Sequence, residues 1–340
     1  MRLIITGGAG FIGSNLVLFL HENYPDIEIL NIDKLTYASD INFLQPLKTS
    51  KRYHFSKIDL VDREAVREAV EKWKPEGVIH LAAESHVDNS IQGPEPFVMS
   101  NVVGTFNILE ECRQFWMNKG KDENFQRFLH VSTDEVYGTL GREGYFTEET
   151  PYAPNSPYSA TKAGSDFLIR SYYHTYGLNV VITNCSNNFG PHQHEEKLIP
   201  TVIRHAFRRT EIPVYGKGVN VRDWLYVHDH CKALMAAYYY GRSGEQYNIG
   251  GDNEWANIEL VNLICDILNE EVGDGPGGDY KKLISFVEDR PGHDYRYAID
   301  ASKIKNELGW SPAGDFKEKL RETVLWYVER LKEAKGDKGK

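Results

Sequence analysis

The chain of 340 residues lacks several features that mark specialised classes of protein. Its four cysteines are widely spaced, with no C-x-x-C pair, so we expect free, buried thiols in a reducing compartment. No apolar run approaches about 18 residues, which argues against a transmembrane helix and a membrane partner. No charged-then-apolar leader precedes the strand-like run at residues 1–6, so we expect a cytoplasmic protein.

Positive charge is also scarce. Lys and Arg number 39 against 49 Asp and Glu, which gives a formal net charge of -10, and no Lys/Arg-rich block precedes the C-terminus. We therefore expect no nucleic-acid partner, because phosphate-backbone binding needs a basic face. A few arginines focused in a cleft would still allow an anionic small ligand.

Short apolar strands alternate with amphipathic helices through the first half of the chain. We predict strands at 3–6, 28–32, 54–58, 77–81, 128–132 and 179–183, and helices at 11–21, 63–73, around 98–115 and at 159–176. This alternation predicts an α/β fold, a doubly wound Rossmann-type parallel sheet. We expect this domain to span residues 1–184, with segments near 221–250 returning to it. A smaller C-terminal substrate-binding α/β domain would span 185–340.

Glycines follow the first predicted strand and open the first predicted helix, at Gly7, Gly8, Gly10 and Gly13. They satisfy G-x-G-x-x-G, which lets the backbone approach a pyrophosphate at the helix N-terminus. Asp33 ends the second strand, where a carboxylate accepts hydrogen bonds from a ribose diol and repels a 2′-phosphate. The pattern therefore favours NAD over NADP. Asp59, after the third strand, is a candidate for the adenine edge, and an ordinary surface aspartate is the alternative.

Tyr158 and Lys162 lie four residues apart at the start of a predicted helix, on one face. A nearby ammonium stabilises a phenolate, so we expect the pKa of Tyr158 to fall below its usual value of about 10, which would make it a base. Ser132 and Thr133, at the end of the preceding strand, are placed to hydrogen-bond the same substrate hydroxyl. Tyr-x-x-x-Lys also arises by chance, so the pair gains weight from sharing a domain with the glycine loop.

Asp134 and Glu135 follow the same strand end, where ligands bind in open α/β sheets. Two carboxyl groups beside a hydride-transfer base suit proton removal at one carbon and proton delivery at the next. We expect burial and the charge of Glu135 to raise the pKa of Asp134. A solvated acidic loop is the alternative that the residues alone leave open.

Arg222 and Arg290 are candidates for binding a diphosphate, because a guanidinium matches the geometry of phosphate oxygens. Two histidine-rich runs, residues 192–196 and 228–230, offer no convincing third ligand at a suitable spacing, so we predict no metal site.

These motifs occur in one order along nearly the whole chain: TGGAGFIGS at 6–14, LAAESHVD at 81–88, STDEVYG at 132–138, YSATK at 158–162, NNFGP at 187–191, EKLIP at 196–200, NVRDW at 220–224 and DRPGH at 289–293. The chain thereby resembles the extended short-chain dehydrogenase/reductases that act on nucleotide sugars, and within them the 4,6-dehydratases. The resemblance implies an NAD-dependent hydro-lyase, a nucleotide-sugar substrate, with dTDP-glucose as the nucleotide sugar, and a homodimer that pairs helices around 98–115 and 159–176.

The resemblance also implies roles for individual residues. Tyr158 takes the proton of the C4 hydroxyl, Glu135 removes the C5 proton, and protonated Asp134 delivers a proton to the departing C6 hydroxyl. Thr133 orients the C4 oxygen and Lys162 tunes Tyr158. The product is a 4-keto-6-deoxy sugar nucleotide.

Two further sets of residues follow from the same resemblance. The cofactor site comprises Gly7, Gly10, Phe11, Ile12, Gly13, Asp33, Lys34, Leu35, Thr36, Asp59, Leu60, Leu81, Ala82, Ala83, Ser85, Ser100, Tyr158, Lys162 and Asn188. The substrate site comprises Ser85, Thr133, Asn187, Lys197, Leu198, Pro213, Val214, Tyr215, Arg222, Asn257, Asp289, Arg290, Pro291, Gly292 and His293.

Three other functions remain open at this point. A nucleotide-sugar 4-epimerase shares the glycine loop and the Tyr158/Lys162 pair but needs no acid and base for C5–C6 elimination. A net oxidoreductase would consume NAD stoichiometrically. A non-catalytic NAD-sensing binding protein would be expected to have lost Tyr158 or Lys162, and both are present.

Overall fold

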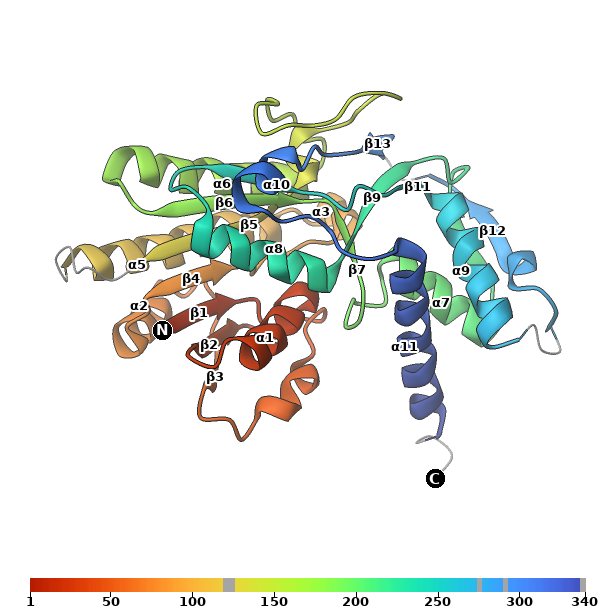
Figure 1. Ribbon diagram of the computed structural model, residues 1–340, viewed down its shortest axis with the longest axis horizontal. Coiled ribbons are helices and arrows are strands. Elements are labelled where there is room, and N and C mark those ends of the chain that lie inside the picture. The colour runs from red at the N-terminus through yellow and green to blue at the C-terminus, as the bar shows by residue number, and fades with distance from the viewer. Residues whose placement is uncertain (119–125, 274–276, 290–292, 337–340) are drawn as a thin grey trace.

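The computed structural model describes residues 1–118, 126–273, 277–289 and 293–336. Its main feature is a seven-stranded parallel sheet in the order β10-β6-β5-β4-β1-β2-β3 (Figure 1). The strands are β1 (Arg2–Thr6), β2 (Glu28–Asp33), β3 (Tyr53–Lys57), β4 (Gly77–His80), β5 (Arg127–Thr133), β6 (Val180–Cys185) and β10 (Gln246–Ile249). The predicted doubly wound α/β fold is confirmed, with the six predicted strands each within two residues of their observed ends.

Helices cover both faces of this sheet because its central strands are apolar on both sides. Leu3 and Ile5 of β1 pack on one face, and Ile4 between them packs on the other. The first face is covered by η1 (Ile41–Leu47), α1 (Phe11–Asn23), α8 (Val227–Tyr240) and α10 (Ser302–Leu308). The second is covered by α2 (Arg63–Trp73), α5 (Thr105–Asn118) and α6 (Pro157–Tyr176).

Short helical segments lead from the sheet into these longer helices. α3 (Val87–Gln92), α4 (Glu95–Phe97) and the π-helix η2 (Val98–Gly104) run into α5, and the 3₁₀-helix η3 (Asp134–Tyr137) follows β5. α6 is bounded by local sequence: Ser156 caps its N-terminus by accepting the backbone N–H of Ser159, and Gly177 ends it with φ +67°. The start of α6 is therefore fixed, which sets the position of Tyr158 on its first turn.

A second group of elements lies to the right in Figure 1 around its own apolar core. Its strands are β7 (Asn187–Phe189), β8 (Ile212–Tyr215), β9 (Val221–Tyr226), β11 (Glu254–Ala256), β12 (Ile284–Val287) and β13 (Arg296–Tyr297). Its helices are α7 (Leu198–Arg208), α9 (Asn257–Glu271), η5 (Tyr280–Leu283) and α11 (Phe316–Gly336). Strand β9 pairs with β7, β11 and β13, so this small sheet places residues 187–189 and 224–226 side by side.

The two groups interleave along the chain rather than dividing at one point. β10 is a strand of the large sheet and α8 packs on that sheet, although both follow the first strands of the second group. Ile304 and Trp310, still later, also pack in the core of the large sheet.

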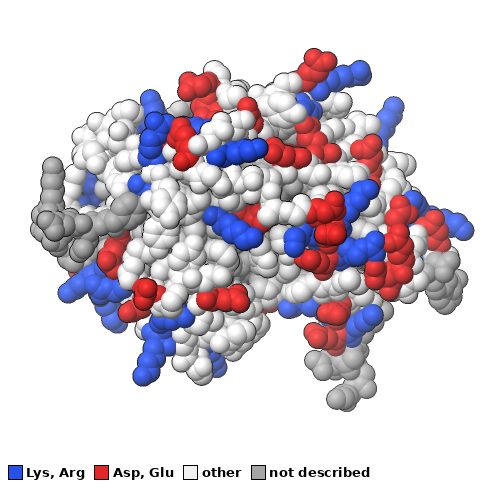
Figure 2. Space-filling view, in the orientation of Figure 1, with Lys and Arg blue, Asp and Glu red and all other residues white. Residues whose placement is uncertain are grey.

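Surface charge and apolar helices give two further observations. On the face in Figure 2, Lys and Arg lie beside Asp and Glu, with no continuous basic band among the described residues drawn there. In the part of the chain that the structure describes, no helix is both long enough and apolar enough to cross a membrane.

The prediction of free, buried cysteines is confirmed, since all four are buried and unpaired with one another.

Candidate active site

A cleft of about 700 Å³ opens at the carboxyl ends of the large sheet's strands and continues to the second group of elements. The loops after β1, β2, β3, β4, β5 and β6 line one side, and residues from α7, β8 and β9 line the other. This is the position at which open α/β sheets bind their ligands.

The glycine loop fills the space between β1 and α1 so closely that side chains are excluded. A Cβ on Gly13 would lie 2.1 Å from the carbonyl oxygen of Gly7, and Gly7 itself has φ +72° with the Ala82 backbone 2.7 Å from its Cβ position. Gly10 stands at the N-cap of α1 and has no side chain to cap the helix. The first N–H groups of α1 are thus available at the cleft, which suits a pyrophosphate.

Asp33 ties the end of β2 to the glycine loop. Its Oδ2 accepts the N–H of Ala9 at 3.0 Å, and its Oδ1 accepts the N–H of Leu35 at 2.8 Å and the hydroxyl of Ser39 at 3.2 Å. A carboxylate has about four acceptor positions, so one remains for a ribose hydroxyl. Every predicted cofactor residue lines the cleft except Leu35, whose backbone, with φ +58°, turns the chain beside it.

Thr133, Asp134 and Glu135 stand where β5 passes into η3. Thr133 is the last residue of the strand and caps η3, because its Oγ1 accepts the N–H of Glu135 at 3.3 Å. All three line the cleft. The predicted acidic pair therefore lies at a structured strand end, which excludes the alternative of a solvated loop for Asp134, whose side chain is 1% exposed.

Asp134 has the environment of a protonated acid. Burial, the carboxylate of Glu135 and then that of Asp223 raise the pKa of Asp134 well above its usual value, against the opposing charge of Arg222. Its Oδ2 has no hydrogen-bond partner among the described residues. A proton on that oxygen would be available to a group bound in the cleft.

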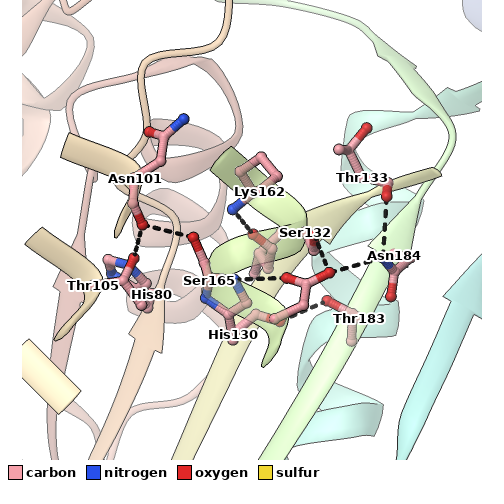
Figure 3. Close-up of polar contacts among 12 residues, drawn as sticks. His80, Asn101, Thr105, His130, Ser132, Thr133, Lys162, Ser165, Thr183 and Asn184 are labelled. Atoms are coloured by element: carbon pink, nitrogen blue, oxygen red, sulfur yellow. Dashed lines mark hydrogen bonds and ion pairs between the residues drawn. The ribbon is translucent and has the colours of Figure 1, made fainter. Parts of the chain in front are cut away.

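Tyr158 and Lys162 both face the cleft from the first two turns of α6, as their spacing predicts. The expected lowering of the tyrosine pKa is wrong for this structure. Burial first, and then the charge of Glu135, raise the pKa of Tyr158 well above 10, although a hydrogen bond with Thr133 opposes this. Lys162 Nζ instead donates to the carbonyl of Val131 at 2.8 Å, and burial lowers the pKa of Lys162 (Figure 3).

The role predicted for Ser132 at the substrate hydroxyl stays a prediction, because its own hydroxyl is hydrogen-bonded within the protein. Ser132 lines the cleft with Thr133, but its hydroxyl donates to Asp166 Oδ2 at 2.8 Å.

Most of the predicted substrate residues also line the cleft. Ser85, Asn187, Lys197, Leu198, Pro213, Val214, Tyr215, Arg222, Asn257 and His293 line it; Asp289 does not, but accepts a hydrogen bond from His293 at 2.6 Å. Arg290, Pro291 and Gly292 lie outside the described residues.

Several contacts hold the side chain of Arg222 in the cleft. Its guanidinium donates to the carbonyls of Val221, Asp294 and Tyr295 and lies 4.3 Å from the centroid of the Tyr297 ring. The side chain is 8% exposed, so its charge is largely desolvated and acts strongly on an anion in the cleft.

Sequence reasoning missed several residues that the fold brings to the same cleft, namely His86, Cys185, Ser186, His194, Glu196, Arg204, Trp224, Asp294 and Tyr297. They come from loops, strands and helix α7, distant in sequence, and only His86, Glu196 and Trp224 fall within the motifs that carry the family resemblance. The histidines of the two histidine-rich runs hydrogen-bond or pair with protein groups: His192 with Ser14, His194 with Glu196, His228 with Asn15 and His230 with Asn188. Among the described residues, no group of three or more His, Cys, Asp or Glu is arranged to hold a metal ion.

Comparisons with known proteins show which families this chain resembles. The family model described as GDP-mannose 4,6 dehydratase matches residues 4–323. A probable dTDP-glucose 4,6-dehydratase of Sinorhizobium fredii is 53% identical, over 97% of this chain and 93% of the relative.

Two solved structures allow the chain to be compared with a dehydratase and with a 4-epimerase. The dTDP-glucose 4,6-dehydratase of Streptomyces venezuelae, crystallised with NAD and a dTDP-related ligand, has a TM-score of 0.89 at 42% identity over 98% of both chains. The UDP-glucose 4-epimerase of Thermotoga maritima has a TM-score of 0.86 at 26% identity, over 97% of this chain and all of its own. The fold is thus common to both, and the sequence is nearer to the dehydratase.

Proposed function

Because this chain belongs to the dTDP-glucose 4,6-dehydratases, we propose that its cleft converts dTDP-glucose to dTDP-4-keto-6-deoxyglucose. The reaction is an NAD-dependent removal of water. It oxidises C4, eliminates water across C5 and C6, and reduces C6, so the cofactor ends in its starting state.

Bound NAD would supply the hydride acceptor for C4 and the hydride donor for C6, and its positive charge would favour the phenolate of Tyr158. The residues suited to hold it are the glycine loop for the pyrophosphate and Asp33 for the adenosine ribose. The free N–H groups at the start of α1 and the remaining acceptor position on Asp33 support this assignment.

Tyr158 is the base for the C4 hydroxyl. Since burial raises its pKa, the phenol gives up its proton only where positive charge is close, and Lys162 is placed one turn along the same helix. The hydrogen bond between Thr133 and Tyr158 fixes the phenol at the strand end, where both contact one substrate oxygen.

Asp134 and Glu135 carry out the elimination. The 4-ketone acidifies the C5 proton, Glu135 removes it, and Asp134 protonates the departing C6 hydroxyl. The single observation that carries the proposal is the environment of Asp134. A carboxyl group kept neutral by burial, with an unpaired buried oxygen, lies next to a second carboxylate in the cleft that holds Tyr158 and Lys162.

The substrate diphosphate is bound by Arg222 with Arg290, and the nucleotide by the residues from α7, β8 and α9. Asn257 supports this assignment, since its Oδ1 is buried and has no partner in the described part of the chain. Such an acceptor gains a hydrogen bond when a donor from the nucleotide arrives.

The alternative functions are disfavoured by particular observations. A 4-epimerase has no use for the neutral acid at Asp134, and the epimerase neighbour is 26% identical where the dehydratase is 42% identical. A binding protein without catalysis does not require Tyr158 and Lys162 together in the cleft.

We also infer a homodimer, a cytoplasmic location and an NAD-binding region that comprises residues 1–184 with α8 and β10. Apolar side chains on η2, α5 and α6 support the dimer: Val98, Met99, Met117, Phe167 and Tyr176 are all at least 36% exposed. Sedimentation of the purified protein across a dilution series tests it, and a monomer at micromolar concentration would contradict it.

The proposed activity is tested by incubating the purified protein with dTDP-glucose and, separately, with UDP-glucose, without added reductant. We expect a 4-keto-6-deoxy product from dTDP-glucose and little or none from UDP-glucose. The appearance of the C4 epimer instead, or of no product from either sugar, would refute the assignment.

A further inference from the structure

A buried carboxylate lies beneath the Tyr158/Lys162 pair. Asp166 follows Lys162 by four residues on α6, so Tyr158, Lys162 and Asp166 lie along one face of the helix at successive turns. Asp166 is 2% exposed. A carboxylate in such a place is unstable unless its oxygens are paired or hydrogen-bonded.

Four side chains from other elements surround this carboxylate. Asp166 Oδ2 accepts the hydroxyls of Ser132 at 2.8 Å and Tyr152 at 2.9 Å and the amide of Asn184 at 3.4 Å. His130 Nε2 lies 3.1 Å from Asp166 Oδ1. Asn184 also donates to the carbonyl of Thr133 at 3.0 Å, so the network reaches the strand end that carries the catalytic acids (Figure 3).

Lys162 needs a counter-charge at this place. Its side chain is 4% exposed, and the hydrogen bond from Nζ to the neutral carbonyl of Val131 supplies no negative charge. Burial lowers the pKa of Lys162, and Asp166 is the main group that raises it, with Cys185 second. An ammonium lost to neutral amine could not stabilise the phenolate of Tyr158.

The other titratable groups around Lys162 and Asp166 do not change charge near neutral pH. They are His80 on β4, His130 on β5, Cys185 on β6, and Tyr137 and Tyr152 from the segment between β5 and α6. Burial lowers the pKa of both histidines, that of His130 to about 4, so they are neutral. Burial raises the pKa of the thiol of Cys185 to about 12 and raises that of both tyrosines, so these remain protonated.

We propose that Asp166 is a positioning residue of the reaction, whose carboxylate is the counter-charge of the Lys162 ammonium and holds Ser132 and Asn184 beneath the catalytic strand end. Asp166 acts through Lys162 on Tyr158 and does not touch the substrate. The inference rests on the proposed function, because it assigns Tyr158 and Lys162 to C4 oxidation.

The test compares Asp166→Asn with Tyr152→Phe, each as the NAD-loaded enzyme. Both remove a hydrogen-bonding group from the same network, but only Asp166→Asn removes the charge. The rate of C4 oxidation is measured in a single turnover, from the absorbance of the reduced nicotinamide, across roughly pH 6 to 9. Melting temperatures are recorded for both variants.

We expect Asp166→Asn to move the alkaline limit of C4 oxidation downward by about 1 pH unit or more, the size of effect that a close opposite charge has on a pKa. Tyr152→Phe should keep the wild-type limit, whatever its melting temperature, and Asp166→Glu should restore it. An alkaline limit in folded Asp166→Asn equal to that of the wild type would overturn the proposal.

Should Asp166→Asn fail to fold, the wild-type enzyme itself provides the test. With ¹³C-labelled lysine, the Cε signal of Lys162, assigned by its loss in Lys162→Met, should report an ammonium throughout neutral pH, and a neutral amine at pH 7 would overturn the proposal. A wild-type enzyme that forms no 4-keto product would instead refute the proposed function, so the two failures are distinguishable.

Discussion

Replacing Asp134 with Asn should strongly slow the second half of the reaction, the elimination of water. The substitution conserves the shape of a side chain that is 1% exposed but removes the proton that burial keeps on it. General acid catalysis contributes about 10²–10⁴-fold, which is about 2.7–5.4 kcal/mol at about 1.36 kcal/mol per factor of ten. Elimination of water should slow by that factor, whereas C4 oxidation depends on Tyr158 and Lys162 and should change much less.

The assay follows a single turnover of Asp134→Asn with dTDP-glucose. The absorbance of the reduced nicotinamide should rise as in the wild type and then persist. Hydride return to C6 consumes the reduced nicotinamide, and it cannot occur until the C6 hydroxyl has left. Product is measured in the same samples. Equal slowing of reduced-cofactor formation and of product formation would refute the assignment of Asp134 as the C6 acid.

The melting temperature of the same variant tests the raised pKa of Asp134 and shows whether unfolding causes the loss of activity. The folded-state pKa of Asp134 is raised, so its contribution to stability is fully present below the unfolded-state pKa of about 3.9 and is lost as pH rises through the folded-state pKa. Asn does not titrate. The melting temperature of Asp134→Asn relative to wild type should therefore increase as pH rises from about 4 toward neutral, and a constant difference would contradict the raised pKa.

Other variants separate the remaining steps. Glu135→Gln should slow exchange of the C5 proton with solvent deuterium by about 10²–10⁴-fold while C4 oxidation persists; unchanged exchange would exclude Glu135 as the base. Tyr158→Phe should abolish formation of reduced nicotinamide, and retention of that signal would exclude Tyr158. Gly13→Ala should weaken NAD binding by about 1–3 kcal/mol, because the added Cβ would lie 2.1 Å from the Gly7 carbonyl oxygen. Gly93→Ala is the control: its Cβ would have no atom within 4 Å, so this variant should retain NAD as the wild type does.

Local patterns in the sequence were sufficient for the large sheet and the glycine loop. The strands alternate with helices of suitable length, and the ends of α2 match the prediction at Arg63 and Trp73 because Asp62 caps one end and Lys74 adopts a left-handed conformation at the other. The spacing of Tyr158 and Lys162 likewise placed both on one helix face.

What the sequence could not predict depends on contacts between distant segments. The direction of Ser132 is set by Asp166, 34 residues later, and the raised pKa of Tyr158 comes from burial that no local pattern reports. Glu196 and Tyr297 reach the cleft only after the second group of elements has packed against the first. Asp166 itself was visible in the sequence, since it continues the spacing of the Tyr158/Lys162 pair by one more turn.

The most direct test of the central claim uses dTDP-glucose that carries deuterium at C4. If the hydride removed from C4 is returned within the same cleft, the deuterium should appear in the C6 methyl group of the 4-keto-6-deoxy product, with no reductant added. Product whose methyl group lacks the label, or label recovered only at C4 of an epimer, would contradict the account.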